Sequence, residues 1–154
     1  MILQDHARTS PVRRRLALAA GLATLAGCGP RSTDKENTVE LSVSESLDQG
    51  ILAVWRDGGE TELAALVDIG LEDLVIIPEG TPAERVHEVA GTTLLSGEYY
   101  HSSTQLFLFR ASGTAVLAAM VAADVFEHEI RNATFGPGVR LVGEGGQSLI
   151  TLRD

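Results

Sequence analysis

The stretch of sequence that decides the fold reads Asp73-Leu74-Val75-Ile76-Ile77-Pro78-Glu79-Gly80-Thr81-Pro82-Ala83-Glu84. Its first half is a continuous apolar run with the length of a buried strand. Pro78 ends that run, because proline cannot donate to the hydrogen-bond ladder of a sheet. The second half predicts a helix in which Thr81 is the N-cap, Pro82 is the first helical residue and Glu84 completes a capping box.

The residues that follow continue as a helix and then as strands. Gly91 would end the helix, since glycine readily adopts the left-handed conformation of a helix C-terminus. Residues 105–110 predict a strand, and Ala111-Ser112-Gly113 predicts a three-residue hairpin loop. Residues 114–123 are rich in Ala, Leu and Met, so their propensity permits a helix. The local turn chemistry favours a returning strand there.

The C-terminal part predicts one more hairpin. Gly136-Pro137-Gly138 is typical of a turn, and residues 140–142 and 148–152 predict two strands around Gly143-Glu144-Gly145-Gly146. This glycine-rich segment lacks the lysine and the following helix of a phosphate-binding loop. A hairpin turn is therefore the preferred interpretation.

Toward the N-terminus the pattern predicts a strand and a second helix. Apolar and polar residues alternate over 39–43, which is typical of a short half-buried strand. Residues 46–49, Ser-Leu-Asp-Gln, fit a capping box, and Asp57-Gly58-Gly59 would end the helix. Residues 63–67 fit either a short helix or a strand. The expected apolar face of the helix is Leu47, Ile51, Leu52 and Trp55.

These elements together predict an α+β fold in one exported globular domain, residues 38–154. We expect a small, largely antiparallel sheet with about two helices packed on one face. Hydrophobic residues make up 44% of the chain, a composition typical of a globular protein with a packed core.

The N-terminus has the pattern of an export signal. Arg13-Arg14-Arg15 precedes an uncharged, mostly apolar run at residues 16–26, which is too short for a bilayer span of about 20 residues. The run ends in Leu25-Ala26-Gly27-Cys28, which resembles the lipobox of bacterial lipoprotein precursors. The resemblance implies cleavage between Gly27 and Cys28 and attachment of lipid to the Cys28 thiol. Residues 1–27 would then be the signal peptide and residues 28–37 a flexible tether.

Charge limits the partners that we expect. Residues 1–27 contain four arginines and one aspartate, so the totals of 12 basic and 21 acidic residues leave 8 and 20 from Cys28 onward, a net charge of −12. Such an acidic domain repels nucleic acid and anionic lipid headgroups. Attachment to the cell membrane or outer membrane is therefore expected through lipid on Cys28, and an envelope protein or glycan remains as a partner. The pattern leaves open which membrane and which export route.

Metal and cofactor chemistry is not expected. Glu84 and His87 lie three apart on a predicted helix, and Asp124, Glu127 and His128 are close in sequence. With 20 acidic residues after the signal, a histidine near carboxylates is expected by chance, whereas zinc needs three or four converging ligands. The chain has four histidines, His6, His87, His101 and His128.

The remaining motifs give little support to catalysis. Ser32 and Lys35 have the Ser-x-x-Lys spacing of penicillin-binding enzymes, but they lie in the predicted tether. Tyr99-Tyr100-His101 is the stretch most typical of a contact surface, although such aromatics can also form the edge of a core. We therefore expect a non-enzymatic binding, inhibitory or structural domain on the outer side of a membrane. The alternative is a small envelope hydrolase that uses histidine and carboxylates.

Overall fold

A computed structural model describes residues 39–154. The predicted signal peptide, the tether, Gly27 and Cys28 lie outside these residues. The described part contains, in chain order, β1 (Leu41–Val43), α1 (Glu45–Asp57), β2 (Gly59–Glu62), α2 (Leu63–Val67), β3 (Asp73–Ile77), α3 (Ala83–Ala90), β4 (Gln105–Ala111), β5 (Thr114–Val121), a 3-10 helix (His128–Ile130), β6 (Thr134–Phe135), β7 (Arg140–Gly143) and β8 (Thr151–Arg153).

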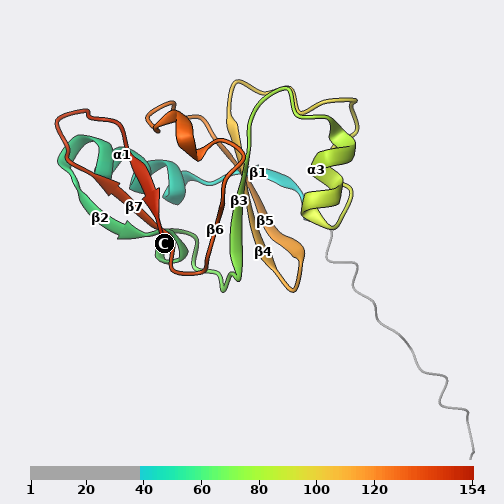
Figure 1. The fold of residues 1–154 in the computed structure, drawn as a ribbon, viewed down its shortest axis with the longest axis horizontal. Coiled ribbons are helices and arrows are strands. Elements are labelled where there is room, and N and C mark those ends of the chain that lie inside the picture. Colours follow the sequence, from blue (N-terminus) through green and yellow to red (C-terminus); the bar gives the residue numbers. More distant parts are fainter. Residues whose placement is uncertain (1–38) are drawn as a thin grey trace, which may run out of the picture. The chain divides into compact units, whose positions relative to one another are not determined.

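The predicted α+β class is confirmed, with two sheets in place of the single sheet expected. The larger sheet has the order β1-β5-β4-β3-β6, in which β1 runs parallel to β5 and the other pairs are antiparallel. The smaller sheet is antiparallel, with the order β2-β7-β8. Figure 1 shows α1 with the smaller sheet on one side of the larger sheet and α3 on the other.

The helices therefore cover both faces of the larger sheet, and the prediction of one covered face was wrong. The reason lies in β3 and β4, whose side chains are buried on both faces. A strand that is apolar on both faces needs cover on both. The face toward α1 carries Leu74, Ile76, Phe107 and Phe109. The face toward α3 carries Val75, Ile77, Leu106 and Leu108.

The β4–β5 hairpin confirms a returning strand at residues 114–121. Ala111 pairs directly with Thr114, so the loop has two residues, Ser112 and Gly113, where we expected three. Their φ angles are +52° and +77°, the combination that a type I′ turn requires. This turn has the twist of the flanking strands, which is why it overrides the helical propensity that follows.

Helix α1 begins two residues earlier than predicted. The Ser44 side chain accepts a hydrogen bond from the Leu47 amide at 3.4 Å and so acts as the N-cap. The predicted apolar face is also wrong at Leu52, which is 42% exposed. Val54 is buried in its place, because spacings of four and seven from Leu47 follow one face of a helix.

Helix α3 begins one residue later than predicted. Pro82 is the N-cap, and the Thr81 hydroxyl instead donates to the Pro78 carbonyl at 2.8 Å. The Thr81 carbonyl accepts a hydrogen bond from the Tyr100 amide, so Thr81 belongs to an extended segment. Gly91 ends the helix with a φ of +67°, as predicted.

Residues 63–67, for which the sequence left helix and strand open, are helical. The turn predicted at residues 136–138 is confirmed, because the Gly136 carbonyl accepts a hydrogen bond from the Val139 amide. The final hairpin pairs β7 with β8, but its second strand starts only at Thr151. The connection between the two strands, residues 144–150, is therefore longer than a simple turn.

This connection closes the C-terminal end of α1. The Gly146 amide donates to the Arg56 carbonyl at 3.0 Å, and the Gln147 amide donates to the Trp55 carbonyl at 3.1 Å. These carbonyls belong to the last turn of the helix, where the helix itself supplies no donors. Gly145 lies so close that an added Cβ would meet the Gly58 nitrogen at 2.7 Å. The glycine-rich segment is thus a helix-capping loop.

We expect Gly145→Ala to destabilise the domain much more than Gly146→Ala. Both glycines have positive φ, +75° and +63°, which costs a residue with a Cβ about 1–2 kcal/mol. Only Gly145 faces backbone atoms; nothing lies within 4 Å of a Cβ on Gly146. The clash should add about 1–3 kcal/mol to the Gly145 variant. Urea unfolding of the two variants measures the difference, and equal losses would contradict the close approach.

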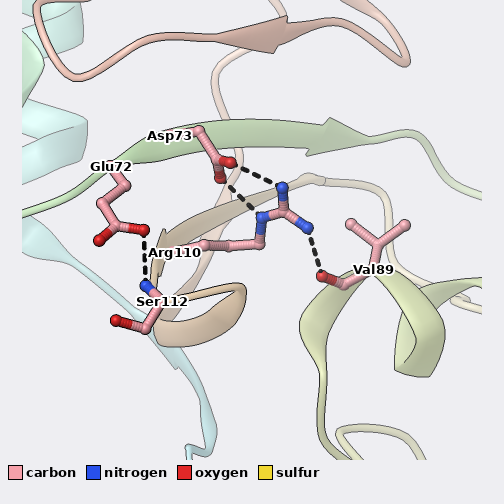
Figure 2. A network of polar contacts seen from close by, with 5 residues as sticks. All are labelled: Glu72, Asp73, Val89, Arg110 and Ser112. Carbon is pink, nitrogen blue, oxygen red and sulfur yellow. Dashed lines mark hydrogen bonds and ion pairs between the residues drawn. The ribbon is translucent and has the colours of Figure 1, made fainter.

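One ion pair connects the centre of the larger sheet with α3 (Figure 2). The Arg110 guanidinium on β4 donates to both carboxylate oxygens of Asp73 on β3, at 2.6 and 2.7 Å. Its third nitrogen donates to the Val89 carbonyl, in the last turn of α3, at 2.9 Å. Hydrogen bonding to Asp73 raises the pKa of Arg110 above its ordinary value, and burial opposes that rise. The adjacent Glu72 carboxylate accepts a hydrogen bond from the Ser112 amide at the hairpin turn.

We expect Arg110→Met to lower the free energy of unfolding by about 1–3 kcal/mol, because it leaves a partly buried carboxylate without its partner. Arg140→Met is the matched control. Arg140 makes one contact with Glu60 at 3.0 Å, and both side chains are about half exposed, at 52% and 53%. Removing such a surface pair should cost less than about 1 kcal/mol. Denaturant unfolding compares the two, and similar costs would mean that Arg110 has no special role.

Candidate functional site

A cleft of about 570 Å³ lies at one end of the larger sheet. It is lined by residues 78–80, 103–105 and 121–124, together with His101 and Arg131. The antiparallel pairing explains why these segments meet. Gln105 at the start of β4 pairs with Val121 at the end of β5, and Ile77 at the end of β3 pairs with Leu106. Residues 78–80, 103–105 and 121–124 therefore lie at the same end of the sheet, although they are distant in sequence.

Backbone hydrogen bonds fix one wall of the cleft. The Gly80 amide donates to the Tyr100 carbonyl, and the Tyr100 amide donates to the Thr81 carbonyl, both at 2.8 Å. Tyr100 is 2% exposed, and its hydroxyl is hydrogen-bonded to the Thr104 hydroxyl. Burial of Tyr100 thus fixes the position of the neighbouring His101, which lines the cleft.

The predicted contact surface is divided by this arrangement. Tyr99 is 46% exposed and lies next to His101, with the ring centres 5.8 Å apart. His101 is exposed and lines the cleft. The prediction was wrong for Tyr100, which packs in the core against α3 and the sheet. Alternation along an extended segment explains the difference, because neighbouring residues point to opposite sides.

The cleft brings together four exposed side chains that can carry charge, Glu79, His101, Asp124 and Arg131. Within residues 39–154, none of them has an ion-pair partner within 4 Å. Four other arginines of this part of the chain do pair with carboxylates: Arg56, Arg85, Arg110 and Arg140. Of the two described arginines without such a pair, Arg131 and Arg153, only Arg131 lines the cleft.

Among the described residues, one of two buried side-chain oxygens without a partner belongs to Gln105, which lines the cleft. The side-chain oxygen of Gln105 and one carboxylate oxygen of Asp48 are buried with no hydrogen-bond partner in the described part of the chain. Burial raises the pKa of Asp48, and a hydrogen bond from the Ala122 backbone partly opposes the rise. Asp48 on α1 does not itself line the cleft, whereas Ala122 does.

The other histidines do not join this group. The Nε2 atom of His87 accepts a hydrogen bond from the Leu95 amide at 3.1 Å, and this bond connects α3 to the segment that follows. His128 is exposed at the start of the 3-10 helix. Among the described residues no group of three or more His, Cys, Asp or Glu side chains is arranged to hold a metal ion. His6, Gly27, Cys28 and the Ser32–Lys35 motif lie outside them.

Sequence reasoning did not select Glu79, Gln105, Asp124 or Arg131 as site residues. The positions of the first three could have been predicted, because each lies at or just beyond the end of a predicted strand. In an antiparallel sheet the end of one strand lies beside the start of the next, so these residues come close together. Arg131 does not lie at the end of a predicted strand. It follows the 3-10 helix His128–Ile130, and its place at the cleft depends on how that segment packs.

Comparison of the chain with known protein families, with curated proteins and with solved structures finds no match. In the part of the chain that the structure describes, no helix has the length and apolar character needed to cross a membrane.

We expect Asp48→Asn to change how stability depends on pH. A carboxyl whose pKa is raised in the folded state favours folding while protonated, and this contribution is lost as the pH rises through the folded pKa. Asparagine does not titrate, so the variant does not lose stability in this way as the pH rises. Its stability relative to the unmodified protein should therefore increase from acidic to neutral pH, as measured by urea unfolding across that range.

Asp57→Asn is the control of opposite sign. Hydrogen bonding to Arg56 lowers the pKa of Asp57, so this carboxylate favours folding at neutral pH and loses that effect as the pH falls. The stability of the Asp57 variant relative to the unmodified protein should decrease toward neutral pH. The same pH trend in both variants would contradict the burial of Asp48.

Proposed function

We propose that this chain is a membrane-anchored lipoprotein of the bacterial envelope whose domain binds a ligand in the cleft at the end of its larger sheet. The observation that carries the binding role is the set of four chargeable side chains in the cleft, Glu79, His101, Asp124 and Arg131, none of them paired among residues 39–154. The anchoring role rests on Leu25-Ala26-Gly27-Cys28 and on the resemblance of this stretch to a lipobox.

Electrostatics supports a binding role for the cleft. Ion pairs within a protein restrict the geometry of both side chains and satisfy their charges. The cleft leaves Arg131 and two carboxylates available to a molecule that enters it. Charged side chains without an ion pair in the protein contribute more to recognition of a ligand than to stability of the fold. A ligand of complementary charge pairs with them, and this pairing makes binding specific.

Lipid on Cys28 would supply the membrane attachment that the acidic domain does not. An acyl chain contributes about 0.8 kcal/mol for each buried CH₂ group, and two chains are enough for stable anchoring. Residues 28–37 would then act as a tether that keeps the cleft away from the membrane surface.

A small envelope hydrolase is the second candidate. It is favoured by the presence of His101, Ser103 and Asp124 around one cleft. In the described part of the chain, His101 makes no hydrogen bond to Ser103 or Asp124 within 3.5 Å. A hydrolase would return its ligand cleaved, whereas a binding domain would return it intact, so mass spectrometry of the recovered ligand separates the two.

We expect Cys28→Ser to abolish lipid attachment and leave an uncleaved precursor, since a serine oxygen cannot form the thioether. Metabolic labelling of bacteria with a palmitate analogue measures the lipid, and electrophoresis measures the removal of residues 1–27. Gly29→Ser is the control: it alters the neighbouring residue and keeps the thiol, so it should be labelled and cleaved normally. Equal labelling of the Cys28 variant and the unmodified chain would refute the anchoring proposal.

A further inference from the structure

We infer that the cleft binds short peptides with a free amino terminus and a free carboxyl terminus. This inference rests on the proposed function, in which the cleft is a ligand site. It follows from the signs of the charges around the cleft. Glu79 and Asp124 offer two carboxylates, and Arg131 and His101 offer nitrogen donors.

The four side chains come from four different segments and do not neutralise one another. Glu79 follows β3, His101 precedes β4, Asp124 follows β5 and Arg131 follows the 3-10 helix. No pair of them lies within the 4 Å of an ion pair in the described part of the chain. Opposite charges held apart in one cleft match a ligand that carries both signs at a separation.

Ligands of other charge fit less well. An anion such as phosphate would gain from Arg131 but would face Glu79, Asp124 and the net charge of −12 carried from Cys28 onward. A cation without an anionic group would leave Arg131 without a partner. A neutral ligand such as a saccharide could hydrogen-bond to these groups through its hydroxyls but would offer no opposite charge to Arg131 or to the two carboxylates.

The rest of the cleft suits a peptide backbone. Its volume of about 570 Å³ lies in the range of pockets that bind small molecules, roughly 300–1,000 Å³. Ser103 offers an exposed hydroxyl group in the cleft, and a hydroxyl can both donate to a carbonyl and accept from an amide. Ala122 and Ala123 line the cleft with small side chains, which leaves room for those of the peptide.

The test is a calorimetric titration of the full chain, purified from bacteria in detergent, with trialanine. N-acetyl-trialanine, trialanine amide and the doubly blocked peptide are titrated in the same way. We expect trialanine to bind, and loss of either terminal charge to weaken binding roughly tenfold, as expected for one charge-assisted hydrogen bond. The doubly blocked peptide should bind most weakly.

Two variants assign the termini. Arg131→Gln should bind trialanine and its amide with equal affinity, because the partner of the carboxylate is gone. The combined Glu79→Gln and Asp124→Asn variant should bind trialanine and its N-acetyl form equally. Arg153→Gln is the control, since Arg153 is exposed on β8, away from the cleft, and has no ion pair among the described residues. The Arg153 variant should bind trialanine more tightly than its amide and its N-acetyl form, by the same factors as the unmodified protein.

The possible failures point to different conclusions. Doubly blocked peptide that binds as well as trialanine would overturn the inference, and so would trialanine that does not bind at millimolar concentration. If phosphate or a saccharide then binds and Arg131→Gln abolishes that binding, the cleft is a ligand site and only the peptide class is wrong. If none of these probes binds in a way that depends on Arg131, the proposed binding function fails as well. The Cys28→Ser result affects neither conclusion, because the titration does not depend on membrane location.

Discussion

Arg110 joins three elements through one side chain. Its two hydrogen bonds to Asp73 fix β4 against β3, and its bond to the Val89 carbonyl holds the last turn of α3 over the same face of the sheet. The register between β3 and β4 decides which residues face each hydrophobic cluster, since a shift by one residue would exchange the faces. Phe107 would then leave the cluster beneath α1, where it packs against Phe126 with ring centres 5.6 Å apart.

The position of the cleft follows from the same register. With Asp73 opposite Arg110 at one end of the pair, Ile77 lies opposite Leu106 at the other. Pro78 and Gln105 therefore lie at the same end of the two strands. The segment that follows Pro78 and the segment that precedes Gln105 form walls of the cleft. The ion pair and the cleft lie at opposite ends of the same two strands.

Much of the fold could be predicted from local patterns, and little of the site. The strands at β3, β4 and β5 and the ends of α1 and α3 follow from apolar runs, turn chemistry and glycine positions. The start of α3 was misplaced because Thr81 is held by Tyr100, a contact 19 residues away that no local pattern contains. Nothing in the sequence distinguishes the buried Tyr100 from its exposed neighbour Tyr99. Arg131 reaches the cleft only through tertiary packing, so its role could not be inferred from the sequence around it.

The loop that caps α1 limits the order in which the chain can fold. Trp55 and Arg56 receive their hydrogen bonds from Gln147 and Gly146, and β2 pairs with β7. About three-quarters of the described chain separates these partners, so closing the loop between them costs conformational entropy before any contact compensates for it. The C-terminal cap of the first helix and the smaller sheet therefore form only once residues 140–153 fold back onto residues 55–62.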